Sequence, residues 1–453
     1  MYSPLSTRTV RRVLALVCVL AAFALTFDST TEARRNAFQA PVTPTPTPAL
    51  PAHTHNGPVD ADHVAHDAAL AEKARGLGAF VLPDVMRAAQ TPAELSQYGM
   101  WNSVTTWPFV FASAASLPDG RILAWGGNNP RSYNGGANTF AAIWNPTTNQ
   151  ITSINHNDHS MFCGIPTMLE DGRVFVNGGD GTRERTSIFD WRTNTWSRVQ
   201  DMNRERWYPG SIALPNGKVF TALGEPGDAY PEIWSPGSGW MMLIGANFTP
   251  ILNSPGYQNN WLPYLHLAPN GNIFHSGPTQ QMHWINPTGN GSVTGANLFN
   301  TWYPKYSAQV MYDVGKVLVV GGQANNSDMP ATNQAFVLDL NGATATRTNV
   351  APMTHARKFH NAVVLPTGEV MVVGGNTTGV EFSDEGTRLE PEIWNPETNT
   401  WRPVADMSVP RNYHSVALLM TDGRVWSGGG GLCNCPADHP DHQVYTPPYL
   451  YNA

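Results

Sequence analysis

Charged side chains are scarce in this chain of 453 residues: Asp, Glu, Lys and Arg make up 13% of it, and the formal net charge is −7. A nucleic-acid-binding protein needs a basic surface that neutralises phosphates, so this balance argues against nucleic acid as a partner. Glycine, proline and aromatic residues are abundant instead, with 41 Gly, 37 Pro, 15 Trp and 14 Tyr. Such a mixture favours many short strands joined by tight turns over a helical fold.

Long apolar runs are also rare, and the one at the N-terminus, from Val13 to Phe27, directly follows Arg11 and Arg12. The run has the length of the apolar part of an export signal and is short for a membrane span. We expect residues 1–33 to be a signal peptide or, if uncleaved, a membrane anchor. The protein is therefore expected to be secreted, or anchored at the outer face of the membrane, with no full span unless this segment is retained.

The following segment, 34–97, is predicted to be a linker. Residues 41–52 read PVTPTPTPALPA, and Pro/Thr repeats of this kind are extended and form no core. Four histidines follow, which we interpret as part of a solvated spacer rather than a metal site: His53, His55, His63 and His66. One or two short helices are expected over 67–97, and the globular domain over 98–453.

Seven similar segments divide the rest of the chain, each with a turn, an apolar strand and glycines. Examples are PDGRILAWGG, EDGRVFVNGG, PTGEVMVVGG and TDGRVWSGGGG, and the turn glycines are Gly120, Gly172, Gly217, Gly271, Gly315, Gly368 and Gly423. The spacing of 44 to 55 residues is typical of kelch-type propeller blades. We therefore predict an all-β fold, a seven-bladed kelch-type β-propeller, in which segment 101–116 starts the first blade and helps to close the ring.

Repeat position predicts spatial position, because the strand before the turn is the innermost strand of each blade. Residues at one offset before the turn should ring the axis at one depth. Nine residues before the glycine stand Phe111, Cys163, Tyr208, Leu262, Tyr306 and Phe359. Blade 7 is predicted to have one extra residue, so that its equivalent is Tyr413, followed by His414. Most of these are ordinary apolar core, but Cys163, Tyr208, Tyr413 and His414 carry chemistry.

This set of side chains suits copper. Two phenolates and an imidazole favour copper(II) in a tetragonal site. Oxidising an alcohol requires two electrons, whereas copper takes one. An electron-rich phenol can store the second, and a sulfur substituent makes a phenol easier to oxidise. Cys163 and Tyr208 lie on neighbouring predicted blades, where the thiol and the ring could meet.

Four motifs resemble those of the copper-radical oxidases, the family of galactose oxidase and glyoxal oxidase: HSMFCGIPTMLEDGRVFVNGG at 159–179, WYP at 207–209, RNYHSVALLMTDGRVWSGGGGLC at 411–433 and YTPPYLYN at 445–452. The resemblance implies a thioether between Cys163 and Tyr208, whose ring is a copper ligand and the radical. It implies Tyr413 as axial ligand and proton acceptor, and His414 as equatorial ligand. The implied enzyme is a copper-dependent oxidoreductase that oxidises a primary alcohol or aldehyde with O2 and releases H2O2.

Two departures from the family pattern stand out. The family's fourth protein ligand is a histidine of a C-terminal sandwich domain, and this chain ends at Ala453, where that domain should begin. We therefore expect either a fragment or an incomplete copper site. The sugar-binding domain of galactose oxidase is also lacking, which favours the glyoxal oxidase side of the comparison.

The predicted substrate rim follows from the same resemblance. Phe382 and Tyr133 align with aromatic walls, whereas Gln258 lies where galactose oxidase presents an arginine. Without that bidentate donor we expect a small alcohol, aldehyde or other carbohydrate rather than galactose. Trp302 and Trp207 are candidates for stacking on the thioether ring, with ordinary core packing as the alternative.

Other polar residues are assigned supporting roles. His360 is interpreted as a structural repeat residue, and His156 and His159 as polar neighbours of the site. Cys433 and Cys435 are spaced for a disulfide over one intervening residue, which is a strained arrangement.

Two other classes of function compete with a monomeric oxidase. One is a non-catalytic propeller that binds glycan or protein at its axial mouth. The other is a structural kelch scaffold, which the Cys–Tyr–Tyr–His set disfavours. Copper content together with peroxide release distinguishes the oxidase from both.

Overall fold

The computed structural model describes residues 69, 71–76, 78, 80–83, 86–88, 91–133, 136–254, 260–302, 304–323 and 330–452. The chain divides into two units, Met1–Gly57 and Pro58–Ala453, and all described residues belong to the second. The predicted signal segment, the Pro/Thr stretch, the four clustered histidines and Gln258 lie outside the described residues. Where the chain is described, no helix is both long enough and apolar enough to cross a membrane.

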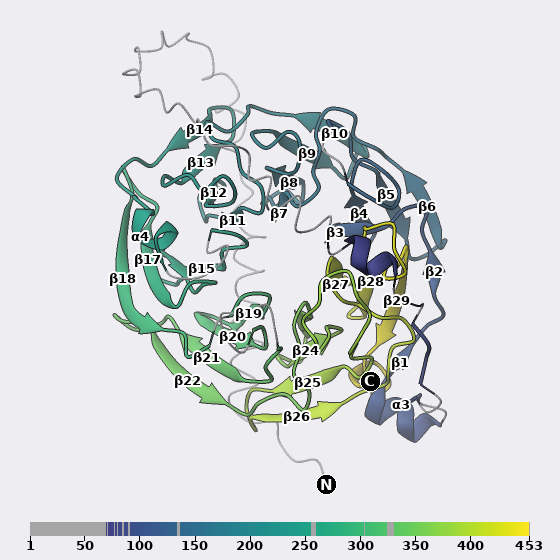
Figure 1. The fold of residues 1–453 in the computed structure, drawn as a ribbon. Helices are drawn as coiled ribbons and strands as arrows, with labels where there is room; N and C mark the ends of the chain where they lie inside the picture. Colours follow the sequence, from purple (N-terminus) through teal and green to yellow (C-terminus); the bar gives the residue numbers. More distant parts are fainter. Residues whose placement is uncertain are drawn as a thin grey trace, which may run out of the picture. The chain divides into compact units, whose positions relative to one another are not determined.

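The second unit is a β-propeller (Figure 1). Over the described residues its strands form seven antiparallel sheets arranged in a ring, as the repeats predict. In blades 1 to 6 the first strand lies innermost and the chain proceeds outward. The first three blades contain β3 (Phe111–Ser116), β4 (Ile122–Gly126), β5 (Ala141–Asn145) and β6 (Gln150–Ser153); β7 (Ile165–Met168), β8 (Val174–Asn177), β9 (Thr186–Asp190) and β10 (Thr195–Arg198); and β11 (Gly210–Ala213), β12 (Val219–Ala222), β13 (Glu232–Ser235) and β14 (Gly239–Met242).

The next three blades repeat this order. They contain β15 (Leu265–Leu267), β16 (Ile273–His275), β17 (Gln281–Asn286) and β18 (Ser292–Phe299); β19 (Ala308–Asp313), β20 (Lys316–Val320), β21 (Ala335–Asp339) and β22 (Thr346–Val350); and β23 (Asn361–Val364), β24 (Val370–Val373), β25 (Glu392–Asn395) and β26 (Thr400–Pro403).

Blade 7 closes the ring by joining the two ends of the propeller. Its inner strands are β27 (Ser415–Leu419), β28 (Val425–Gly429) and β29 (Asp441–Thr446), and its outer edge is formed by β1 (Met100–Trp101) and β2 (Thr105–Thr106). Met100 is opposite Thr446 and Thr105 is opposite His442 in the antiparallel register. The start of segment 101–116 thus closes the ring, and β3 begins blade 1, in agreement with the sequence prediction.

The hairpin between the first two strands of a blade explains the recurring turn motif. Gly120 and Gly423 have φ values of +85° and +86°, which glycine adopts without steric cost. The preceding Asp119 accepts a hydrogen bond from the Arg121 N–H at 3.2 Å, and Asp422 accepts one from the Arg424 N–H at 3.0 Å. The motif Asp-Gly-Arg therefore encodes both the turn and its side-chain lock.

Buried arginines hold the chain in position just before the inner strands of blades 3, 6 and 7. Their guanidinium groups donate to main-chain carbonyls and pair with a carboxylate at the start of the third strand: Arg206 with Glu232 at 3.3 Å, Arg357 with Glu392 at 2.9 Å and Arg411 with Asp441 at 2.5 Å. Each arginine is fully buried. Two or three residues after each of them comes a residue that surrounds the propeller axis: Tyr208, Phe359 and His414.

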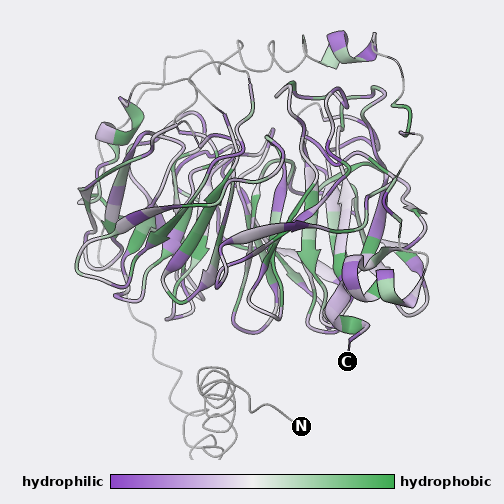
Figure 2. Ribbon diagram, turned by 90° about the horizontal axis from the view of Figure 1, so that it is seen from below, coloured by the Kyte–Doolittle hydropathy of each residue, from purple (hydrophilic) through white to green (hydrophobic). Residues whose placement is uncertain are grey.

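Few helices accompany the propeller in the described residues. Helix α3 (Pro92–Tyr98) starts at a capping box formed by Thr91 and Glu94, and α4 (Thr249–Leu252) and the 3₁₀ helix η1 (Pro448–Leu450) are single turns. Residues 71–75 form a further helical turn. Figure 2 shows this turn on the face of the ring opposite the one at which the chain ends.

Candidate metal centre at the propeller axis

Six blades enter their inner strand through a residue with a left-handed backbone, and these residues surround the axis. The φ values are +56° at Cys163, +55° at Tyr208, +49° at Leu262, +57° at Tyr306, +64° at Phe359 and +68° at His414. Non-glycine residues rarely adopt this conformation, and such strained positions cluster at functional sites. Neighbouring members are linked, because the Tyr208 N–H donates to the Cys163 carbonyl at 3.2 Å and the Leu262 N–H donates to that of Tyr208 at 3.0 Å.

The blade 7 member corrects the sequence alignment. The prediction that blade 7 has one extra residue made Tyr413 the equivalent of Tyr208, but the left-handed residue is His414. His414 lies nine residues before Gly423, the same offset as in the other blades, so no extra residue exists. Tyr413 instead occupies the preceding position, which is filled by Trp207 in blade 3.

Two phenol groups meet at the axis. The Tyr208 and Tyr413 hydroxyl oxygens are 3.0 Å apart, although the residues come from blades 3 and 7. Both side chains are buried, with 4% and 6% of each residue exposed. The Tyr413 ring stacks on the His414 imidazole, with ring centroids 3.9 Å apart. The structure therefore brings together Tyr208, Tyr413 and His414.

The imidazole of His414 is oriented with one nitrogen held and the other available. Its Nδ1 lies 2.6 Å from the Gly431 carbonyl oxygen, which requires the proton on Nδ1. Nε2 is buried and has no hydrogen-bond partner among the described residues. Burial lowers the pKa of His414 to about 4, with the bond to Gly431 opposing the shift, so the ring is neutral at pH 7. A neutral imidazole with a held Nδ1–H and a bare Nε2 is the form that binds metals.

Cys163 lies beside Tyr208. The two residues are joined by the main-chain hydrogen bond between blades 2 and 3, and the partly exposed Cys163 thiol packs on the apolar cluster that contains Tyr208. A cavity of about 330 Å³ runs along the axis, and its lining includes Cys163, Tyr208, Tyr306, Phe359, Tyr413 and His414.

Aromatic rings enclose the two phenols. Trp207 and Trp261 both stack on Tyr208, with centroid distances of 4.9 Å and 5.1 Å. Phe382 meets the Tyr413 ring edge-on at 5.1 Å and the His414 ring at 5.5 Å. Tyr133 stacks on Phe162 at 4.1 Å and meets the His414 ring at 6.4 Å.

Trp302 is not part of this enclosure. Its indole N–H donates to the Gly321 carbonyl at 3.1 Å, and its ring packs against Phe336 in the core between blades 4 and 5. The prediction that Trp302 stacks on the Tyr208 ring is wrong, and the core alternative holds, because the residue is inside the blade packing. Trp261 was missed by the sequence reasoning. Its signal was its offset, since it precedes Leu262 as Trp207 precedes Tyr208.

Three other histidines singled out in the sequence form hydrogen bonds to groups other than Tyr208 and Tyr413: His360, His156 and His159. His360 is bonded through Nε2 to the Val320 carbonyl at 3.1 Å, and burial lowers its pKa to about 3. His156 and His159 each lie 2.9 Å from the Ser187 hydroxyl of β9. These bonds fit the supporting roles assigned to them.

A helical turn from the N-terminal part of unit 2 covers the axial residues. Ala71 and Ala74, one turn apart, are only 7% and 4% exposed and belong to one apolar cluster with Tyr306, Phe382 and Tyr413. The cluster also contains Cys433. The same face of the propeller therefore carries the helical turn, the Phe382 ring and the Tyr413 ring.

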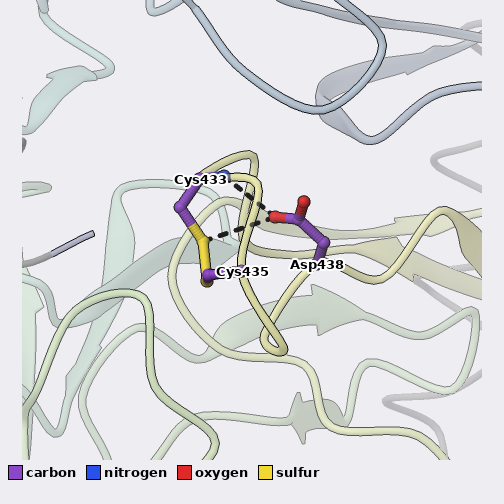
Figure 3. Close-up of side chains that lie close together, drawn as sticks. All are labelled: Cys433, Cys435 and Asp438. Carbon is purple, nitrogen blue, oxygen red and sulfur yellow. Dashed lines mark hydrogen bonds between the residues drawn. A yellow bond between two sulfur atoms is a disulfide. The ribbon is translucent and has the colours of Figure 1, made fainter. Parts of the chain in front are cut away.

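Cys433 and Cys435 form a disulfide beside this cluster, with Asp438 next to it (Figure 3). These three residues are the one group of histidine, cysteine and acidic side chains that is close enough for a metal within the described part of the chain. Both sulfurs are engaged in the disulfide, and metals bind thiolates. The trio therefore does not fit a metal in this state, and the donor set at Tyr208, Tyr413 and His414 does.

Comparisons with known proteins show to which family the chain is similar. The sequence model of the family "Glyoxal oxidase N-terminus" matches residues 136–437. Galactose oxidase of Gibberella zeae is 33% identical over 395 residues, which cover 82% of this chain and 58% of the relative. Aldehyde oxidase GLOX of Vitis pseudoreticulata is 24% identical over 324 residues, which cover 64% of this chain and 61% of the relative.

A solved structure is similar over most of the chain. A fungal alcohol oxidase in complex with copper superimposes with a TM-score of 0.74 at 33% identity, covering 78% of this chain and 77% of the other. The chain thus spans about three fifths of the length of the curated relatives. The family match covers most of the propeller, including Cys163, Tyr208, Tyr413 and His414. This chain therefore belongs to the glyoxal oxidase family of copper-radical oxidases.

Proposed function

We propose that the protein is a copper-dependent oxidase that converts a small primary alcohol or aldehyde, with O2, into the oxidised product and H2O2. The observation that carries the proposal is the meeting of the Tyr208 and Tyr413 hydroxyls at 3.0 Å beside a buried His414 Nε2 that has no hydrogen-bond partner among the described residues. A buried polar atom without a partner calls for an explanation, and beside two phenol oxygens a bound metal ion is one that fits.

The donor set fits copper(II). Two phenol oxygens and one imidazole nitrogen are ligands that copper(II) accepts, and it binds such sites more tightly than other divalent metals of its row. Bound at Tyr208, Tyr413 and His414, copper would supply one electron of redox capacity and a place for the substrate oxygen. We assign Tyr208 and Tyr413 as the phenolate ligands and His414 as the neutral one.

Tyr413 is assigned as the proton acceptor. Tyr413 lines the axial cavity, and its ring is held between His414 and Phe382, so the phenolate has a fixed direction. A positioned base of this type typically accelerates a reaction by about 10²–10⁴-fold. The substrate hydroxyl proton passes to the Tyr413 oxygen when the alcohol enters the cavity.

Tyr208 is assigned as the store for the second electron. We propose that its ring forms a thioether with Cys163, which lowers the potential at which the ring is oxidised. Stacking of Trp207 and Trp261 on Tyr208 shields the ring from water. The overall reaction balances as RCH2OH + O2 giving RCHO + H2O2, and the aldehyde hydrate reacts in the same way to the acid.

The cavity and its walls support the proposed substrate class. About 330 Å³ bordered by aromatic rings suits a small alcohol or aldehyde. The relatives named above are a galactose oxidase, an aldehyde oxidase and an alcohol oxidase. Gln258 at the position of the family's arginine disfavours galactose. We further propose export directed by residues 1–33, a linker over 34–97 and the catalytic propeller over 98–453.

The test is to load metal-free protein with Cu²⁺ and to measure H2O2 released from glyoxal, methylglyoxal, glycolaldehyde, galactose and simple primary alcohols. Release is expected with at least one aldehyde or alcohol and is expected to be weakest with galactose. The control is Tyr413→Phe, which keeps the ring packing and removes the proton acceptor. Stoichiometric copper without peroxide from any substrate would favour the non-catalytic axial binder.

A further inference from the structure

Gly431, in the loop between β28 and β29, is bonded to both Tyr413 and His414. Its N–H donates to the Tyr413 carbonyl at 2.9 Å, and its carbonyl accepts the Nδ1–H of His414 at 2.6 Å. Gly431 has a φ of +83°, and a Cβ there would lie 2.6 Å from the Asp438 Oδ1. The loop therefore approaches the site with its main chain, and the direction of one carbonyl sets the direction of the imidazole.

Asp438 binds the N–H of the Gly431–Leu432 peptide group, whose carbonyl accepts the proton of His414. Its Oδ1 accepts the Leu432 N–H at 2.7 Å and the Cys433 N–H at 2.9 Å. Figure 3 shows the carboxylate facing the Cys433 nitrogen and the disulfide sulfur. The Asp438 side chain is 1% exposed, so water does not compete for these donors.

The link between Asp438 and His414 is a single planar unit. The Gly431 carbonyl and the Leu432 N–H belong to one peptide bond, whose six atoms lie in a plane. The hydrogen bond from the Leu432 N–H to Asp438 therefore also fixes the direction of the Gly431 carbonyl, which accepts the Nδ1–H of His414. Leu432 is itself in the left-handed region, with a φ of +74°, so the peptide would otherwise be free to relax.

We propose that Asp438 is a positioning residue for His414: by fixing the Gly431–Leu432 peptide, it keeps the imidazole in the tautomer and orientation that present Nε2 at the axis. Asp438 is not among the residues that line the axial cavity. Its effect on copper binding rests on the proposed function, whereas its effect on the His414 ring does not.

The hydrogen-bond acceptor of Asp438 matters here, and its charge does not. Oδ2 accepts no hydrogen bond from a described residue, and the Arg131 guanidinium is 4.0 Å away and half exposed. An asparagine presents an amide oxygen in the place of Oδ1. Asp438→Asn should therefore preserve the His414 geometry, and Asp438→Leu, similar in size but without an acceptor, should not.

The experiment begins with metal-free protein labelled with ¹⁵N-histidine. The His414 signals are assigned by their loss in His414→Gln. In the wild type and in Asp438→Asn, we expect a protonated Nδ1 with a slowly exchanging, strongly hydrogen-bonded proton, and an unprotonated Nε2. In Asp438→Leu we expect that proton to exchange rapidly and the two tautomers to mix. Asp406→Asn is the matched control, because its half-buried carboxylate accepts from Arg87 at the outer edge of the propeller.

Copper binding is then measured by competition with a chelator and by the electron paramagnetic resonance of bound Cu²⁺. Loss of a residue that orients a ligand typically costs about 10–100-fold in metal affinity. We expect such a loss for Asp438→Leu, with an altered spectrum, and little change for Asp438→Asn or Asp406→Asn.

The proposal is overturned if folded Asp438→Leu, with its disulfide intact, keeps the wild-type His414 signals. Asp438→Val provides the same test if leucine prevents folding. Altered His414 signals with unchanged copper affinity would support the positioning and contradict His414 as a copper ligand. The two hypotheses can therefore fail separately.

Discussion

At the scale of single residues, the distance in sequence from the turn glycine of each blade determines which side chains lie at the axis. The left-handed ring places Cys163 directly before Tyr208 in the series, with a main-chain hydrogen bond between them. Because a main-chain hydrogen bond joins the two residues and Cys163 packs on the apolar cluster that contains Tyr208, we expect oxidative joining of the thiol to the phenol ring to need little movement of either side chain. The joining removes two hydrogens, which O2 takes up as H2O2.

We predict that copper-loaded protein exposed to oxygen loses two hydrogens in a Cys163–Tyr208 crosslink. Intact mass and peptide mapping should reveal one joined peptide pair. Cys163→Ser is the control, since it keeps a side chain of similar size, should remain folded, and should show no mass change. Separate, unmodified peptides from fully metal-loaded wild-type protein would contradict the prediction.

The same offsets show how far the sequence could predict the site. Cys163, Tyr208 and His414 are identified by a fixed distance to the turn glycine, because the inner strand imposes one geometry on every blade. Trp261 and Trp302 could not be told apart by residue type. What separates them is whether a tryptophan immediately precedes a ring residue, and Trp261 does. The roles of Gly431 and Asp438 depend on the path of an irregular loop, which no periodicity encodes.

At the scale of elements, buried ion pairs anchor the segments that lead to the axis. Arg357 and Glu392 are both buried and 2.9 Å apart. Burial acts to raise the pKa of Glu392, but Arg357 and hydrogen bonds from Thr354 outweigh it, so the pKa is lowered. Removing the arginine alone leaves an uncompensated carboxylate inside the protein.

We therefore expect Arg357→Met to lower the free energy of unfolding by about 3–5 kcal/mol. The double variant Arg357→Met with Glu392→Gln should recover a large part of this loss, because no buried charge remains. Urea denaturation followed by fluorescence measures both. Equal destabilisation of the single and double variants would show that packing, rather than the unpaired charge, dominates.

The helical turn at 71–75 is a second element whose contribution can be measured. Ala71 and Ala74 pack on the cluster that contains Tyr413 and Phe382. An aspartate at both positions would place two charges against aromatic rings, so the turn should leave the axial face. We expect Ala71→Asp with Ala74→Asp to speed the reaction of the Cys163 thiol with a bulky maleimide in metal-free protein. Cys18, the other cysteine outside the disulfide, is replaced by serine so that only Cys163 reacts.

The matched control for that experiment changes the other side of the same turn. Glu72 and Lys73 are exposed, so substituting them by alanine should leave the labelling rate of Cys163 unchanged. Equal rates in the aspartate variant and the wild type would mean that reagents reach the thiol by another route. A small maleimide is tested beside the bulky one. If only the bulky reagent is slow in the wild type, the opening to Cys163 is narrow; if both are slow, the thiol is covered.

At the scale of the whole molecule, buried neutral histidines make stability depend on pH. Burial lowers the pKa of His159, His275, His360 and His442 to about 3 and that of His266 to about 4, from an ordinary value of 6.5. These imidazoles are spread over several blades of the propeller. Below pH 6.5 the unfolded chain binds protons at these positions and the folded chain does not. Each such ring therefore contributes stability that is complete above pH 6.5 and is lost as the pH falls toward its folded pKa.

His275 allows the effect of one of these imidazoles to be measured separately. His275 is fully buried, and neither ring nitrogen has a hydrogen-bond partner among the described residues. Burial is the largest cause of its lowered pKa, followed by the nearby His283. Between pH 6 and pH 4 the ring should weaken the folded state by about 1.4 kcal/mol per pH unit.

We expect His275→Gln, which is polar but does not titrate, to be close to the wild type or somewhat less stable at pH 7.5, and to lose less stability on acidification. Urea midpoints at half-unit steps of pH measure the slope for both proteins. Parallel curves would show that His275 is protonated in the folded state over this range, and would place the acid sensitivity of the propeller elsewhere.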